Sequence, residues 1–151
     1  MSLTFRRFVV FLLLVVGTAL ARAVDYEFDA SRYAAIAYSV STGKCGYAWN
    51  HTSRHAAEKV ALSEVDASDA KIVGWVNRGW LVLVVGGDNS YGVGWRFGNG
   101  AKLSTATDSA MEECLKRTDK IRRVIRLGSG NFSPQVVSWD PPVSPSKFIY
   151  K

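Results

Sequence analysis

The chain states one pattern twice, and this repetition constrains the fold more than any other feature. The first copy covers residues 34–65 and the second covers residues 80–114. Each copy opens with an apolar run, turns at a glycine-containing segment, returns through Gly-x-x-Trp (Gly46–Trp49 and Gly92–Trp95) and enters an alanine-rich stretch of helical period. A unit that occurs only twice indicates a pseudo-twofold domain rather than a solenoid, which needs three or more units.

Both copies predict the same order of elements, β-β-α-β. In the first half we expect strands at 33–40, 45–50 and 71–76, and a helix capped by Thr52 or Ser53. In the second half we expect strands at 81–85, 91–97 and 121–127, and a helix capped by Ser104 or Thr105. The alternating pattern of 33–40 predicts one buried face, whereas the continuous apolar run at 81–85 predicts a central strand that is covered on both faces.

The predicted fold class is therefore α+β. Two pseudo-symmetric halves, about 33–79 and 80–131, share one core in antiparallel or mixed sheets flanked by two helices. Whether each third strand pairs within its own half or crosses to the other half stays open.

The first 23 residues have the layout of a secretory signal peptide. Arg6 and Arg7 precede an apolar run of about 13 residues, which is short for the ~30 Å core of a membrane. Ala21-Arg22-Ala23 offers a cleavage site after Ala23, so we expect a secreted or periplasmic protein; an uncleaved membrane anchor is the alternative. Cleavage lowers the formal charge from +6 to +3, because the leader holds three of the 19 Lys and Arg and none of the 13 acids. A net positive charge this small does not predict nucleic acid as a partner.

The two ends of the mature chain differ in character from the repeated part. Residues 24–32 form a mixed lead-in arm, and residues 132–151 form a proline-rich C-terminal arm. The prolines exclude a regular helix or a central strand there. We expect an extended arm that is partly docked on the domain, with disorder near Pro141 to Ser146.

The repeated motifs resemble a known family. Tyr33-Ala-Ala-Ile-Ala-Tyr38, Gly46-Tyr-Ala-Trp49 and the helix residues Ala57-Glu58 with Ala61-Leu62 are similar to domain of unknown function 4189, a family of small exported bacterial proteins. The resemblance covers about Tyr33 to Asn131 and implies an exported α+β domain with two related halves and no assigned reaction.

The cysteines depart from the pattern of that family. Its members often carry a cysteine at each helix end and partner cysteines near the third strands. Here Cys114 stands at the second helix end, but Val65 stands at the first, and Trp80 and Gly128 occupy the partner positions. The disulfides of that family therefore cannot be assigned to this chain. Export would expose the chain to oxidising surroundings, so one bridge between Cys45 and Cys114 stays open.

Candidate chemical groups are few and poorly clustered in sequence. His51 and His55 lie four residues apart, as metal ligands on one helix face do, but a helix that begins after His51 would separate them. Cys45 near these histidines could form a nucleophile pair, although a packed or bridged cysteine is the simpler interpretation. Glu64 and Glu113 occupy matching positions on the two helices. We predict no catalytic residue, no metal ligand and no cofactor.

Two surface features remain as binding candidates. The densest run of cations is a potential anion-binding patch, although it also fits a helix C-terminus followed by an exposed strand face. Its members are Lys116, Arg117, Lys120, Arg122, Arg123 and Arg126. The strands are also rich in aromatic residues, but the equivalence of Trp49 and Trp95 favours a structural role for both.

We therefore predict an exported, non-catalytic binding domain. The expected partner is a macromolecule, either a protein or a component of the cell envelope. One alternative is a secreted effector or inhibitor that acts on a host or competitor protein. The other is a small hydrolase that uses Cys45 or a pair made of a histidine and a carboxylate, which would require these groups to converge in a pocket.

Overall fold

A computed structural model describes residues 31–130 and 132–144 of the chain. The predicted signal peptide at 1–23 and most of the lead-in arm, residues 24–30, lie outside these described residues.

Seven strands and two helices are found in the described residues. The first half contains β1 (Tyr33–Tyr38), β2 (Cys45–His51), α2 (Arg54–Ser63) and β3 (Lys71–Val76). The second half contains β4 (Gly79–Gly86), β5 (Tyr91–Phe97), α3 (Leu103–Leu115) and β6 (Ile121–Gly128), and is followed by β7 (Gln135–Val143).

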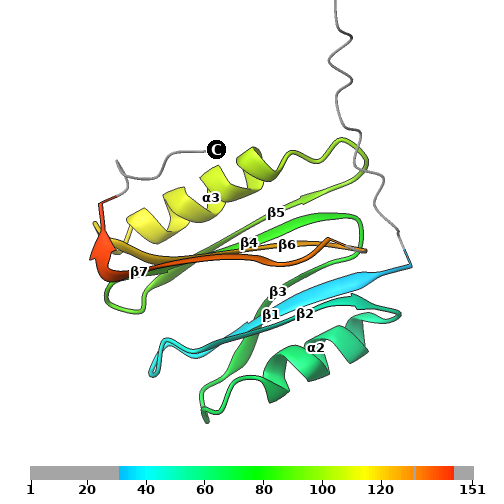
Figure 1. Cartoon of the computed structure of the whole chain (residues 1–151), viewed down its shortest axis with the longest axis horizontal. Coiled ribbons are helices and arrows are strands. Elements are labelled where there is room, and N and C mark those ends of the chain that lie inside the picture. The colour runs from blue at the N-terminus through cyan, green and yellow to red at the C-terminus, as the bar shows by residue number, and fades with distance from the viewer. Residues whose placement is uncertain (1–30, 131, 145–151) are drawn as a thin grey trace, which may run out of the picture.

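The elements stack in four layers, with the two helices outside and the two sheets inside (Figure 1). The sheet of the first half has the strand order β2-β1-β3, and we call it sheet A. The sheet of the second half has the order β5-β4-β6-β7, and we call it sheet B. Every pair of neighbouring strands is antiparallel, which confirms the predicted α+β class.

The central core lies between the two sheets. Its buried members come from β1, β3, β4 and β6: Ala34, Ile36, Tyr38, Val76, Leu81, Leu83, Val85, Ile125 and Leu127. Two further clusters fill the spaces between each sheet and its own helix. The prediction of a single buried face for β1 was wrong, because α2 covers the face that sheet B does not, and Ala35 and Ala37 are fully buried there. The prediction that β4 is covered on both faces is confirmed, since the whole strand is buried.

The two halves share one topology. In each half the first strand lies centrally, and the return strand and the third strand pair on either side of it. Each third strand pairs within its own half, β3 with β1 and β6 with β4, which answers the question that the sequence left open. Descent of the halves from a duplication stays a prediction.

Glycines in the two return strands allow each helix to lie directly on its sheet. A Cβ atom at Gly46 would collide with the backbone carbonyl of Ala61 in α2. A Cβ atom at Gly92 would collide in the same way with the carbonyl of Ala110 in α3. The glycine of each Gly-x-x-Trp motif and the alanine stripe of each helix are therefore two sides of one contact.

The C-terminal arm is more regular than its prolines predict. Residues 135–143 form β7, an edge strand that pairs with β6 through Val136, Val137 and Ser138. An edge strand tolerates proline because one side of its backbone needs no partner. The prediction of disorder was therefore wrong for residues 141–143, and residues 145–151 lie outside the described part.

The helix starts agree with the sequence in one case of two. Ser53 caps α2 by accepting a hydrogen bond from the amide of Ala56, as predicted. In α3 the predicted caps Ser104 and Thr105 lie inside the helix, and the N-cap is Lys102, whose side chain makes no capping bond.

We expect Gly92→Ala to destabilise the fold by about 1–3 kcal/mol, since the added methyl group would push α3 away from β5. Urea unfolding monitored by circular dichroism measures this change. Gly87→Ala is the matched control, because its nearest new contact is the ring of Pro142 at 3.3 Å and not a backbone atom. Equal stability of the two variants would contradict the close-packing account.

Candidate functional site

A groove of about 770 Å³ follows the outer edge of β5, between this strand, α3 and the turn after β1. We call it the β5 groove. Its lining residues are Val40, Ser90, Tyr91, Gly92, Val93, Trp95, Ser109, Glu112, Glu113, Lys116 and Arg117.

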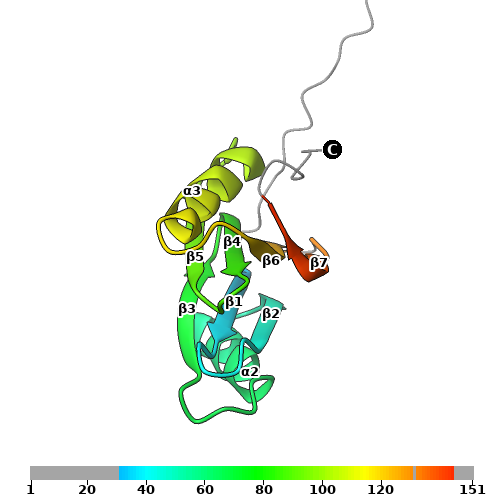
Figure 2. The same cartoon turned by 90° about the vertical axis from the view of Figure 1, so that its left-hand side faces the viewer.

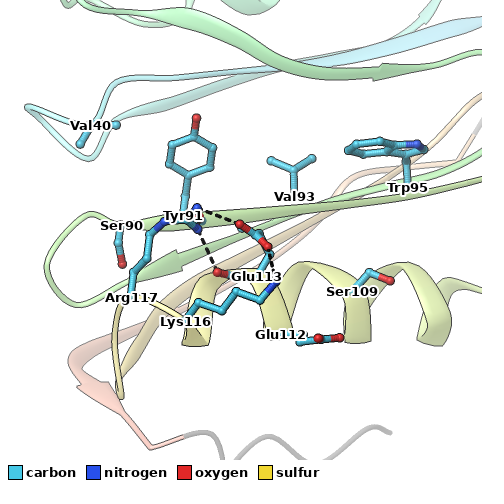
Figure 3. A pocket seen from close by; sticks show the side chains of 11 residues that line it. Val40, Ser90, Tyr91, Val93, Trp95, Ser109, Glu112, Glu113, Lys116 and Arg117 are labelled. Carbon is cyan, nitrogen blue, oxygen red and sulfur yellow. Dashed lines mark hydrogen bonds and ion pairs between the residues drawn. The ribbon is translucent and has the colours of Figure 1, made fainter.

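One wall of the β5 groove is a row of apolar side chains. Tyr91, Val93 and Trp95 alternate with Gly92 and Gly94, so the larger side chains all point away from α3 (Figure 3). Trp95 has 49% of its surface exposed, so about half of the side chain is available for contact. An exposed indole beside a groove is a surface that a ligand can cover.

The other wall is polar and held by ion pairs. Glu113 binds the ammonium group of Lys116 and the guanidinium of Arg117, each at 2.8 Å. Hydrogen bonds from these two cations lower the pKa of Glu113, so the carboxylate stays charged at neutral pH. The charges lie on the α3 side of β5 and the apolar row lies on its other side, so the groove along this edge is amphipathic (Figure 3).

The arginines of this groove also cap the unpaired edge of β5. Arg117 donates to the carbonyl oxygen of Tyr91 at 3.2 Å, and Arg96 donates to that of Trp95 at 2.7 Å. Both carbonyls lie on the side of β5 that faces away from β4. Charged side chains over a strand edge oppose the addition of another strand. The β5 groove is therefore suited to side chains or sugar rings more than to an extra strand.

A second groove lies at the equivalent place in the first half. It has a volume of about 530 Å³ and follows β2 along α2, and we call it the β2 groove. Its lining residues are Cys45, Gly46, Tyr47, Ala48, Trp49, His51, Val60 and Glu64. Trp49, like Trp95, is exposed, at 39%.

The groups proposed for chemistry are only partly brought together. Cys45, His51 and Glu64 line the β2 groove, Glu113 lines the β5 groove, and His55 lines neither of these two grooves. Cys45 and His51 stand at opposite ends of the same extended strand, and six residues of strand separate them by roughly 20 Å. A hydrogen bond between Cys45 and His51 is excluded by this distance.

The spacing of the two histidines does not produce a metal site. His51 ends β2, the cap Ser53 follows, and His55 lies in the first turn of α2, so the two imidazoles do not share a helix face. Among residues 31–130 and 132–144, no group of three or more His, Cys, Asp or Glu side chains is placed to hold a metal ion.

Cys45 and Cys114 are both free thiols, so the bridge that the sequence left open is absent. Cys45 packs on the core between the sheets, whereas Cys114 packs between sheet B and α3, which places sheet B between them. Burial raises the pKa of Cys45, although the guanidinium of Arg123 lies 3.3 Å from its sulfur atom. Burial also raises the pKa of Cys114 to about 11. Reactive cysteines have lowered pKa values, so neither thiol fits a nucleophile.

Four cations of the predicted anion-binding patch, Lys116, Arg117, Arg122 and Arg123, each have a hydrogen-bond partner within the protein. Lys116 and Arg117 pair with Glu113 in the β5 groove. Arg122 donates to the side chain of Asn89 and to the carbonyl of Gly87, which fixes the turn between β4 and β5. Arg123 donates to Ser138 of β7 as well as contacting Cys45, and the Nε atom of Arg126 is buried. These bonds favour structural roles over one common anion site.

Sequence reasoning missed several residues that complete the site. Val40, Ser109 and Glu112 line the β5 groove, but none of them belongs to a motif. The hydroxyl of Tyr38 donates to the carbonyl of Asn89 at 2.8 Å and so joins β1 to the turn before β5. The alternation of Gly92 and Gly94 with larger residues is the one signal that could have located the apolar wall.

The chain belongs to the family described as Domain of unknown function (DUF4189), whose profile matches residues 33–126. This match confirms the resemblance that the repeated motifs indicated. No curated protein and no solved structure matches the chain. Within the described part of the chain, no helix is both long enough and apolar enough to span a membrane.

We expect the purified mature chain to take up two equivalents of iodoacetamide when it is denatured without reductant, because both cysteines are free. The intact mass measures the number of adducts. In the native protein at neutral pH alkylation should be slow, since the raised pKa values keep both thiols protonated. A denatured chain that takes up no label before reduction would show that a disulfide forms.

Proposed function

We propose that this protein is an exported, non-catalytic binding domain that holds a macromolecular partner in the β5 groove. The observation that carries this proposal is the half-exposed Trp95, which stands in the apolar row opposite the fixed Glu113 ion pairs. The indole offers apolar contact area, and the ion pairs offer oriented polar groups.

The shape of the groove favours a polymer over a small molecule. It runs along an exposed strand edge and is open to solvent, whereas sites for small ligands enclose most of the ligand surface. A polypeptide or an envelope glycan could extend along β5 and place one residue against Trp95. An inhibitor of a foreign protein would use the same surface as a protein that binds the cell's own envelope. The identity of the bound partner distinguishes these two roles.

The proposal of a non-catalytic role rests on how the reactive groups are distributed. Cys45 and His51 are too far apart to act as a pair, and Glu113 is engaged by two cations. An acid–base catalyst needs its proton donor and acceptor within hydrogen-bond reach of one substrate. Cys45 and His51 do not meet this requirement.

We expect a photo-crosslinking residue at Glu112 to capture a discrete partner when the protein is exported by its native host, and Trp95→Ala to abolish the adduct. Denaturing electrophoresis and mass spectrometry detect and identify the captured species. The control places the same crosslinker at Lys59, which is exposed on α2 and lines neither groove. Adducts that are equally strong at both positions, or that survive Trp95→Ala, would count against the β5 groove.

Export makes a separate prediction. The protein recovered outside the cytoplasm should begin at Val24, because the leader is cut after Ala23. N-terminal peptide mass spectrometry measures this, and Ala23→Arg should leave the leader attached. A chain recovered with its first residues intact would instead support a membrane anchor.

A further inference from the structure

We propose that the outer edge of β2 accepts an extended polypeptide segment of a partner protein, which becomes a fourth strand of sheet A. This surface is separate from the β5 groove, and the inference does not depend on the function proposed for that groove.

The backbone of β2 has unpaired groups that face outward. Among residues 31–130 and 132–144, β2 pairs only with β1. The carbonyl of Lys44 accepts a hydrogen bond from the amide of Ser39 at 3.0 Å, so Lys44 points toward β1. Because backbone direction alternates along a regular strand, the amides and carbonyls of Cys45 and Tyr47 point away from β1. The pairing of β2 with β1 shifts by one residue beyond Ala48, so the alternation ends there. Only another polypeptide offers donors and acceptors at the matching spacing.

The equivalent edge in the second half provides an internal comparison. There, Arg117 and Arg96 occupy the outward carbonyls of Tyr91 and Trp95. Asn50 follows the first Gly-x-x-Trp motif directly, and Arg96 follows the second, so Asn50 is the β2 equivalent of Arg96. In the part of the chain that the structure describes, no side chain donates a hydrogen bond to the outward carbonyls of Cys45 or Tyr47. The edge of β5 is therefore protected against strand addition, and the edge of β2 is open from Cys45 to Ala48, before the bulge at Asn50.

Sheet B supplies a surface for the added strand. It has four strands against the three of sheet A, and Figure 2 shows β7 on the side where sheet B extends past β2. Val136 of β7 is opposite Ile125, a residue of the core between the sheets, and so lies on the inner face of sheet B. Val136 is 43% exposed. A strand beside β2 would cover Val136 and the exposed face of Trp49.

The other face of the added strand would meet the β2 groove. Val60 of α2 lines this groove and is 37% exposed, and Glu64 lies farther along the same helix. Arg123 bridges Cys45 and Ser138 and closes the space between β2 and β7 at one end. The segment that fits is extended and carries an apolar side chain at every second position, where it faces β7.

A single segment suits this edge better than a second copy of the chain. Twofold pairing of two β2 strands would bring the β7 strand of each copy toward the same seam, because β7 extends past β2 (Figure 2). One extended segment meets no such obstacle. We therefore assign the edge to a peptide segment and treat self-association as a competing outcome of the test.

The test selects linear random-sequence peptides, displayed on phage, on the full mature protein. We expect the selected peptides to alternate apolar and polar residues and to slow hydrogen exchange at the amides of Cys45 and Tyr47. Val60→Arg should weaken their binding by about tenfold or more, since it places a charged side chain in the groove. Leu62→Arg is the matched control, because Leu62 is also 37% exposed on α2 but does not line the groove.

Three results would overturn the proposal. In the first, no peptide is selected, or the selected peptides protect amides of β5 instead of β2. In the second, Val60→Arg and Leu62→Arg change the affinity equally. In the third, light scattering finds a dimer of the unliganded protein that Val60→Arg dissociates, which would assign the edge to a second copy. The exchange map reports the site even if a substitution disturbs the fold.

Discussion

The face-to-face contact of β1 with β4 is the constraint on which the rest of the structure depends. Both strands are central in their sheets and buried on both faces, and Ile36, Leu81 and Leu83 are fully enclosed between them. Removing this apolar surface from water is the main favourable term that holds the sheets together. A three-stranded sheet with one helix would leave its inner face exposed, so sheet A needs sheet B in order to fold.

This arrangement separates the residues that build the fold from those that are free to bind. The inner strands and the glycine–alanine contacts of the helices are used for packing in both halves. The outer strands β2 and β5 carry equivalent exposed tryptophans, but different side chains surround them. Arginines cap the edge of β5 and leave a groove for side chains, whereas the edge of β2 keeps its backbone groups open. Two related edges thus acquire different binding properties without any change in topology.

The sequence predicted the fold better than the site, for physical reasons. Strand and helix periodicity is local, so β3 and β5 were predicted with the bounds that the structure has, and the cap Ser53 was one of the two residues proposed for that position. Burial of both faces of β1 depends on a sheet and a helix that pack from elsewhere, and no local pattern encodes it. The grooves were missed for the same reason, since strand and helix residues meet only after packing. Cys45 and His51 looked close in sequence, but an extended strand separates them widely.

Native-state hydrogen exchange of the mature protein tests the shared core most directly. If β1 and β4 form one cooperative unit, the buried amides of both strands exchange only through global unfolding, with the free energy that urea denaturation gives. Ile36 in sheet A and Leu83 in sheet B, both of which are fully buried, should therefore open with equal free energies. Exchange of the first half at a clearly lower free energy than the second would show that the halves fold separately, and would contradict the account.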